Sequence, residues 1–494
     1  MAAASSARSV ASQSLAAFAV LLINITSGMG LGWPSPAWIK LTEPAASDNH
    51  TGGPGFILDV DEASWVVALY DTGIPLGSVL AGLLLSSAGR RRTLMLAPLL
   101  VMSSCALAAT ASSSTPLKVA RVLHGMSFGM EMSLSSLYIG EMTSSDMRGK
   151  LCTFTSSLVF VGVLIEYIIG PYVSYLAQAL LPVPFALLSL VLCLVWVPES
   201  PYFLAARGRH EEMHRALARL RGLRAGDRHP DVDGEAEEIL RFTEQDRRRK
   251  RIQWRHLLSS AGSRRGCLIV LFLCGTAPLT GTGCLLAYAE YMFRTTGSAL
   301  PSEIAAIIMS SVQVAAGVAS SQVIDRAGRR PLLLVSSLCN AGAMVVAGIF
   351  FFLRDALGNN EAASHITWLP LAALMVFMVS NNLGTTTVPW VMIGELLPLQ
   401  VKAFIPSLSV LGFSIVAFSA NKLLPVLVER VGLFLPFWTF GAWSIVIFVF
   451  TFFMVPETRG KTLLEVQALL EGDKAKLRHQ EATALDPEDN QERC

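Results

Sequence analysis

The sequence has little charge. Only 15% of its 494 residues are Asp, Glu, Lys or Arg, whereas a soluble protein carries roughly 25%. Hydrophobic residues make up 52% of the chain, and its mean hydropathy is +0.50. These values exclude an ordinary soluble protein and predict a chain that crosses a membrane many times. The net charge of +2 says little about partners, because the positions of charges along such a chain matter more than their sum.

Patterns that carry catalytic or metal chemistry are also missing. The eight cysteines include no C-x-x-C pair, and no histidines cluster at metal-ligand spacing. The sequence has no nucleotide-binding loop and no combination of nucleophile and base, and its longest polar segment is too short for a catalytic domain. We therefore expect no enzyme activity, no cofactor, no metal and no nucleic-acid partner. Because the cysteines fall mostly in apolar runs, we expect them to act as small hydrophobic residues.

Apolar windows of about 20 residues, the length that crosses a bilayer core, recur along the chain. They predict an all-α membrane protein with twelve transmembrane helices, at 13–33, 64–86, 93–111, 116–140, 151–175, 177–197, 265–293, 302–324, 331–353, 367–394, 402–428 and 432–455. The first run is too long for a cleavable signal peptide and should anchor itself.

The spans form two groups of six around one polar segment. The expected divisions are a cytoplasmic N-terminus, an N-terminal six-helix half, a linker, a C-terminal six-helix half and a cytoplasmic tail, at 1–12, 13–197, 198–263, 264–455 and 456–494. Within the linker, Met213, Leu217 and Leu220 share one face of a short amphipathic helix.

Lysine and arginine gather in the loops on one side of the predicted membrane, together with the linker, and this side should be cytoplasmic. Both termini then lie in the cytoplasm. Asn49 begins an Asn-His-Thr sequon in the first loop on the other side, so we expect it to be glycosylated. A plasma-membrane location fits this arrangement, and an endolysosomal membrane would fit the glycosylation equally.

Three motifs recur in both halves in the same order. Gly89-Arg90-Arg91 matches Gly328-Arg329-Arg330, the stretch from Glu141 to Arg148 matches that from Glu395 to Lys402, and Pro198-Glu199-Ser200 matches Pro456-Glu457-Thr458. Repeats of this kind are typical of transporters built from two related halves.

These motifs, with Arg121-Val122-Leu123-His124-Gly125, Asp325-Arg326 and Pro389-Trp390, resemble the sugar porter family of the major facilitator superfamily over about residues 13–465. Trp65-Val66 and Tyr138-Ile139-Gly140-Glu141 are most similar to insect facilitated trehalose transporters. The resemblance implies the major facilitator fold and facilitative transport of a sugar, such as trehalose or a hexose, or of a related polyol, by a protein that works as a monomer in the lipid bilayer.

The arginines and carboxylates at the cytoplasmic helix ends are expected to form a gate, because a guanidinium can bind a carboxylate through two parallel bonds. The gate residues are Arg90, Arg91, Glu141, Arg148, Glu199, Asp325, Arg326, Arg329, Arg330, Glu395, Lys402 and Glu457. Ser86 and Lys402 depart from the family's usual Asp and Arg, which predicts an asymmetric gate. The alternative is that the arginines merely follow the positive-inside rule.

Substrate is expected near the middle of the membrane, where helices are broken by glycine or proline. Breaks are predicted at 277–283 and 384–390, and the candidate binding residues are Gln313, Trp390, Ser156, Thr280 and Gly384. Most amides that relatives use for the sugar are absent, because the corresponding places hold Ser156, Ala277-Pro278, Gly283 and Phe413.

Three acids, Asp71, Glu131 and Glu166, lie within apolar spans, where a carboxylate is costly and a candidate for function. In proton-coupled relatives an acid in the first span faces an arginine in the fourth; here Arg121 remains, but the first span has Gly28-Met29-Gly30. This favours facilitated diffusion. A proton-coupled symporter using one of the three acids, and a sugar sensor that does not transport, remain the alternatives.

Overall fold

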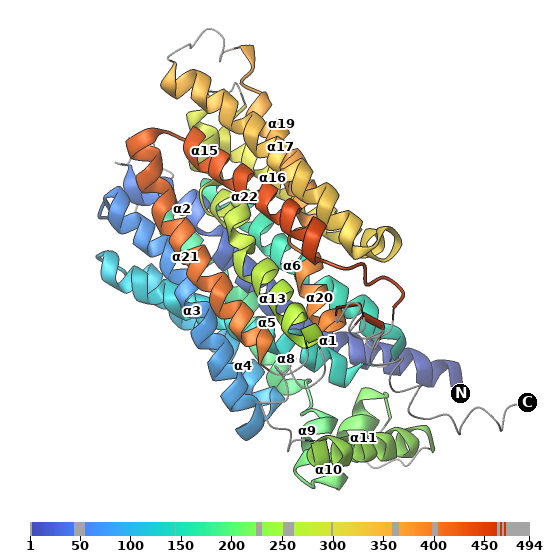
Figure 1. Cartoon of the computed structure of the whole chain (residues 1–494). Coiled ribbons are helices and arrows are strands. Elements are labelled where there is room, and N and C mark those ends of the chain that lie inside the picture. The colour runs from blue at the N-terminus through green and yellow to red at the C-terminus, as the bar shows by residue number, and fades with distance from the viewer. Residues whose placement is uncertain are drawn as a thin grey trace, which may run out of the picture.

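The computed structural model describes residues 2–43, 55–143, 145–223, 230–249, 261–297, 300–357, 365–397, 404–461, 465–466 and 469–470. The predicted sites Asn49 and Lys402, and the side chains of Arg148, Ser156 and Asp325, lie outside the described part of the chain. Throughout the described ranges the regular structure is helical (Figure 1).

The N-terminal group of helices matches the first six predicted spans. They are α1 (Ala2–Gly32), α2 (Pro34–Thr42), α3 (Val60–Ser87), α4 (Arg90–Ala109), α5 (Ser114–Met142), α6 (Ser145–Ile169), η1 (Gly170–Tyr172), α7 (Tyr175–Leu180) and α8 (Val183–Val195). Prolines at the start of α8 divide the sixth span, and Pro34 begins the short helix α2 just beyond the predicted first span, because proline fits the first turn of a helix and not its interior.

The C-terminal group matches the other six spans. It consists of α13 (Ala261–Thr276), η2 (Ala277–Thr280), α14 (Thr282–Ala287), α15 (Ala289–Thr295), α16 (Ser302–Ala327), α17 (Arg329–Phe351), η3 (Phe352–Ala356), α19 (Leu369–Leu383), α20 (Val388–Leu396), α21 (Ile405–Val431) and α22 (Phe434–Met454). Both predicted breaks are confirmed: η2 and Gly281 interrupt the seventh span, and residues 384–387 interrupt the tenth.

The expected twelve-span architecture is therefore confirmed. Within the described ranges, ten stretches are long and apolar enough to cross a membrane by length and composition alone. The fourth and fifth spans, on α5 and α6, are the other two. Helix α5 is long but carries Lys118, Arg121, Glu131 and Glu141, so its length and its packing against α3 and α4, more than its composition, identify it as part of the bundle.

Short helices in the linker form a small unit of their own. They are α9 (Pro201–Ala206), α10 (His210–Leu220) and α11 (Pro230–Arg249). Leu204, Met213, Leu217, Val232 and Ile239 are buried together between them, which confirms the amphipathic face predicted for α10. Figure 1 shows this unit at one end of the bundle, here called the linker end, with α2 and α15 toward the opposite, far end.

Packing differs between the two ends. At the far end a single hydrophobic cluster combines residues of both halves, including Trp38, Tyr167, Tyr288 and Phe350. Toward the linker end the clusters are separate: one holds Leu94 and Tyr138 of the N-terminal half, another Leu333 and Met392 of the C-terminal half. The two halves thus share a core at the far end.

Candidate functional site

A cavity of about 470 Å³ lies between the two halves. The N-terminal half contributes lining residues from α1, α3, α5 and α6, and the C-terminal half from η2, α14, α20 and α21. Its polar lining residues are Asn24, Tyr70, Asp71, Glu131, Ser135, Thr155, Thr282, Thr386, Thr387 and Asn421. The rest of the wall is mainly aliphatic and aromatic, as is usual in small-molecule sites.

Trp390, predicted as a binding residue, does line this cavity. It lies on α20, directly after the break in the tenth span, and its ring centroid is 6.1 Å from that of Phe413 on α21. The two aromatic rings give the C-terminal wall of the cavity an apolar surface.

The other predicted binding residues lie elsewhere. Thr280 donates to Ala277 O at 2.8 Å within η2. A side chain on Gly384 would overlap Ser336 of α17, so this glycine permits close packing. Gln313 is fully buried on α16, and its amide atoms have no hydrogen-bond partner within the described part of the chain. Thr280, Gly384 and Gln313 are all absent from the cavity lining.

A buried amide network, which the sequence reasoning missed, holds the two helix breaks together. Asn381 Nδ2 on α19 donates to Thr282 Oγ1 of the seventh span at 2.6 Å and to Thr386 Oγ1 of the tenth at 2.6 Å. Asn340 on α17 donates to Thr385 Oγ1 at 2.8 Å. The sequence did carry a signal for this network: both asparagines lie inside apolar spans, where an amide needs a hydrogen-bond partner from a neighbouring helix.

The three membrane-embedded acids do not share one environment. Asp71 and Glu131 line the cavity. Glu166 is fully buried elsewhere in the N-terminal half, where Gln178 Nε2 donates to its Oε1 at 2.9 Å. The same Gln178 accepts a bond from Lys40 Nζ at 2.8 Å. Glu166 therefore belongs to a structural network near the far end.

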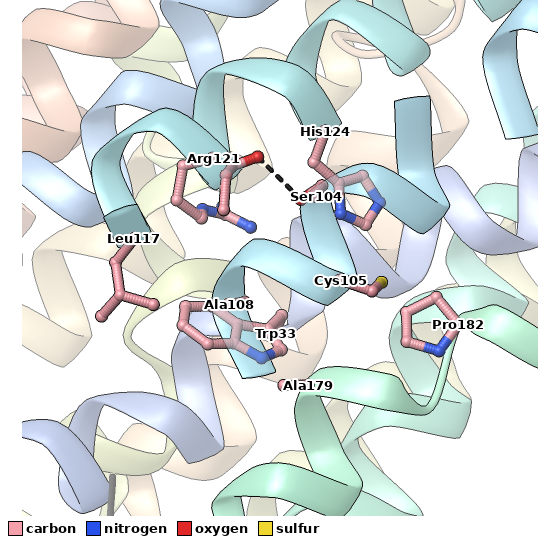
Figure 2. Close-up of a pocket in the computed structure, with 10 residues that line it drawn as sticks. Trp33, Ser104, Cys105, Ala108, Leu117, Arg121, His124, Ala179 and Pro182 are labelled. Carbon is pink, nitrogen blue, oxygen red and sulfur yellow. Dashed lines mark hydrogen bonds between the residues drawn. The ribbon is translucent and has the colours of Figure 1, made fainter. Parts of the chain in front are cut away.

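Arg121 has no carboxylate partner from the first span. Its Nη1 donates to Gly30 O at 2.7 Å, and its guanidinium lies 4.6 Å from the ring centroid of Tyr70. A side chain on Gly30 would come within 2.4 Å of the His124 ring. Figure 2 shows Arg121 and His124 beside Trp33 around a small pocket of about 20 Å³, close to the size of one water. At Gly30, in the first-span stretch that corresponds to the coupling acid, the His124 ring thus leaves no room for a side chain.

At the linker end, the predicted carboxylate pairs form within the N-terminal half. Arg90 of α4 binds Glu141 of α5 through Nε at 3.1 Å and Nη2 at 3.0 Å. The backbone N–H groups of Arg90 and Arg91 donate to Glu199 at 2.7 and 3.1 Å. Ser200 also donates to Glu141, so three segments of this half meet at one cluster.

The C-terminal half repeats this arrangement. Arg329 of α17 binds Glu395 of α20 at 3.0 Å through Nε and at 2.9 Å through Nη2. The N–H groups of Arg329 and Arg330 donate to Glu457 at 3.1 Å each. Thr458 donates to Glu395 at 2.5 Å. The carboxylate contacts of the two clusters thus involve matching residues, and each cluster lies within a single half.

Arg326, also predicted for the gate, is exposed at the end of α16. Both clusters depend on a glycine before the helix: Gly89 has φ +94° and Gly328 has φ +88°, conformations that other residues rarely adopt. A side chain at either position would also meet Glu199 or Glu457.

The far end is closed by polar contacts between the halves. Lys422 of α21 binds Asp61 Oδ1 of α3 at 2.5 Å and lies 4.8 Å from the ring centroid of Trp65. Arg294 of α15 binds Glu43 at 2.8 Å. Trp38 of α2 also packs edge-on against Tyr288 of the other half, with ring centroids 4.9 Å apart. The structure is therefore sealed at the far end.

Comparison with known proteins agrees with this geometry. Residues 15–470 match the family model described as "Sugar (and other) transporter". The chain is 30% identical over 461 residues to a facilitated trehalose transporter, Tret1, of Culex quinquefasciatus, covering 92% of this chain and 85% of that protein. It is 28% identical to Tret1 of Polypedilum vanderplanki, covering 93% and 88%. Some curated relatives are longer, and the chain spans 55% of Tret1 from Aedes aegypti.

Among solved structures, the inward-open xylose transporter XylE of E. coli superposes with a TM-score of 0.73 at 19% identity, over 93% of this chain and 99% of that one. A partially occluded inward-open form of the same transporter gives a TM-score of 0.70 at 20% identity, over 92% and 100%. At these identities the superposition establishes the fold.

Proposed function

The chain belongs to the family of sugar and other transporters, and from this premise we propose that it carries a sugar passively across a membrane by alternating access. The central cavity carries this proposal. It is lined by both halves, and its volume of about 470 Å³ falls within the roughly 300–1,000 Å³ of small-molecule sites.

The contacts at the two ends support an inward-facing state. At the far end, Lys422–Asp61 and Arg294–Glu43 join the halves, whereas Arg90–Glu141 and Arg329–Glu395 each stay within one half. Opening the far end requires the first two pairs to separate. The linker-end clusters then move as rigid parts of their halves until they face each other and close the cytoplasmic mouth, which is our proposal for the gate.

The orientation rests on the loop charges. With the linker end in the cytoplasm, both termini are cytoplasmic and the sealed far end faces outward. We further propose that the protein functions as a monomer in the plasma membrane, with its N-terminal half, linker and C-terminal half divided as the sequence predicts.

The cargo class follows from the cavity wall and from the relatives. Trp390 and Phe413 offer aromatic faces, against which the C–H face of a pyranose ring can pack, and Asn24, Thr386 and Asn421 supply hydrogen-bonding groups. Curated relatives of similar length are named as trehalose transporters. We therefore propose trehalose or a hexose as the substrate.

Proton-coupled symport is the second candidate, because Asp71 and Glu131 line the cavity. Against it, Arg121 is engaged by backbone carbonyls and aromatic rings where coupled relatives have an acid. The decisive comparison is sugar uptake with and without an imposed pH gradient. Sugar accumulation driven by the pH gradient would show that the protein is a proton-coupled symporter and not a facilitative transporter.

The main test is uptake of radiolabelled trehalose, glucose, fructose and polyols in cells that lack their own transporters. We expect saturable uptake of at least one sugar, and an increase in KM of about tenfold or more for Trp390→Ala, since stacked aromatic contacts contribute on the order of 1 kcal/mol beyond their buried area. Trp368→Ala is the matched control, because Trp368 is 61% exposed and absent from the cavity wall.

A protein that reaches the cell surface and binds sugar, but transports none of these solutes, would support the sensor alternative instead.

A further inference from the structure

One hydrogen bond crosses the cavity between the two halves. Asn421 Nδ2 on α21 donates to Asp71 Oδ2 on α3 at 2.7 Å. Both side chains are buried, at 6% and 4% exposure, and both line the cavity. The bond therefore lies where a substrate would be held and also joins the parts that must separate when the far end opens.

Asn421 has unused capacity for a ligand. Its Oδ1 has no hydrogen-bond partner within the described part of the chain. The neighbouring wall residue Gly283 has no side chain, and a Cβ there would lie 3.9 Å from Asn421 Nδ2. The Asn421 amide thus offers a buried acceptor that has no competing partner in the described part of the chain, beside a glycine that leaves room for a ligand group.

The same residue is tied to the far-end seal. The backbone O of Asn421 accepts a bond from the Tyr288 hydroxyl at 2.9 Å, and the Tyr288 ring packs against Trp38 of the other half. The next residue, Lys422, binds Asp61 and Ser64 near the start of α3. Movement of Asn421 away from Asp71 thus displaces residues that hold the seal closed.

We propose that Asp71 and Asn421 couple substrate recognition to the opening of the far end. A hydroxyl of the substrate donates to the Asp71 carboxylate, and a second oxygen of the substrate accepts from Asn421 Nδ2, so ligand bonds replace the direct bond between the two residues. A further substrate hydroxyl can donate to the unpaired Asn421 Oδ1. Neighbouring hydroxyls of a sugar present this donor and acceptor pair at the required spacing. This inference rests on the proposed transport of sugar. It gives Asp71 and Asn421 a role in linking substrate binding to the opening of the far end, which a hydrogen bond that only stabilises the fold would not have.

The test uses a cysteine reporter in the far-end seal of the full-length protein in intact cells. Ala37 of α2 is fully buried in the cluster that both halves share, so Ala37→Cys reacts with an externally added, membrane-impermeant thiol reagent only when the seal opens. The reaction of the same protein without the reporter gives the background from native cysteines. Modification rates are compared with and without trehalose, and again with and without glucose.

With the reporter alone, we expect sugar to accelerate modification. Asp71→Ala removes the acceptor and should raise the rate without sugar by about tenfold, the effect of losing a hydrogen bond to a charged group, and sugar should then add nothing further. Lys422→Gln is the matched control: it weakens the seal outside the cavity, so its higher basal rate should still rise with sugar. Asn421→Ser provides a second disruption of the same bond if Asp71→Ala does not reach the cell surface.

An Asp71→Ala protein that keeps the parent's basal rate and its sugar acceleration overturns the proposal. If neither sugar alters the parent's rate and neither is taken up, sugar transport itself fails. The basal rates of Asp71→Ala and Asn421→Ser still decide whether this bond holds the far end closed.

Discussion

At the scale of single residues, the glycines before α4 and α17 allow the backbone conformation on which the two arginine–carboxylate clusters depend. Gly328 combines φ +88° and ψ 158°, a region essentially restricted to glycine, and a Cβ there would lie 2.9 Å from Glu457 Oε2. The conformation directs the N–H groups of Arg329 and Arg330 to one carboxylate. Substitution therefore affects both the backbone and the cluster that it supports.

We predict that Gly328→Ala lowers the free energy of unfolding by about 2–3 kcal/mol, combining backbone strain with displacement of Glu457. Gly460→Ala is the control, because Gly460 also has a positive φ, +68°, but its Cβ would meet nothing within 4 Å. Thermal unfolding in detergent checks the difference. Equal effects of the two substitutions would show that the contact with Glu457 contributes little.

Glu457 also gives the protein a defined pH dependence. Burial alone would raise its pKa, but N–H groups of Arg459, Arg329, Arg330 and Thr458 donate to the carboxylate and hold its pKa below the ordinary 4.5. Because the folded pKa is depressed, this stabilisation is present above pH 4.5 and is lost as the pH falls through the folded value.

We therefore expect the stability difference between the parent and Glu457→Gln to be largest near neutral pH and to shrink below pH 4.5. Melting temperatures in detergent across this range measure it. A difference that stays constant from neutral to acidic pH would contradict the assignment. The carboxylate is partly exposed, so the expected effect is a modest one of about 1 kcal/mol or less.

At the scale of elements, the sequence predicted all twelve spans and both breaks, because apolar length and glycine or proline placement are local properties. The arginine and carboxylate partners were also predictable, since the motif repeats in both halves. The residues that line the cavity were only partly predictable: Trp390 does so, but the other predicted binding residues whose side chains the structure describes do not. Gln313 and Gly384 lie in the expected spans but point elsewhere, because the rotation of a helix about its axis depends on its neighbours and is only weakly encoded in an almost uniformly apolar span.

The network around Asn381 gives a prediction at this scale. Asn381 joins α14 to the break before α20, so Asn381→Leu should leave several buried hydroxyls unpaired and loosen both breaks. We expect a loss of about 2–3 kcal/mol in stability together with a lower kcat for transport. Asn382→Leu is the matched control, because Asn382 Nδ2 bonds Met378 O of its own helix. Unfolding and uptake measurements on both variants test this, and equal losses would refute a bridging role.

At the scale of the whole molecule, function depends on the balance between two sets of contacts. The far-end cluster and its ion pairs join the halves, whereas the linker-end clusters keep each half rigid. The fold and the repeated motifs could be inferred from the sequence, but which end of the molecule is closed in this structure could not. Glu43, Asp61 and Arg294 lie at or near helix ends, and Lys422 lies inside α21. Only the three-dimensional arrangement brings Lys422 to Asp61 and Arg294 to Glu43.

Charge reversal at Arg294 and Glu43 tests this balance. Their side chains are 51% and 47% exposed, so the pair should contribute only about 0.2–1 kcal/mol to the sealed state, equivalent to a change of at most about fivefold in the population with an open far end. Glu43→Gln alone should increase modification of the Ala37→Cys reporter by no more than this factor, and Glu43→Arg should increase it further because it adds repulsion with Arg294. The double variant Glu43→Arg with Arg294→Glu restores attraction with the signs exchanged, and the modification rate should return to that of the parent. If the double variant reacts as fast as the single one, the ion pair does not hold the far end, and the seal depends on the apolar packing of Trp38 against Tyr288.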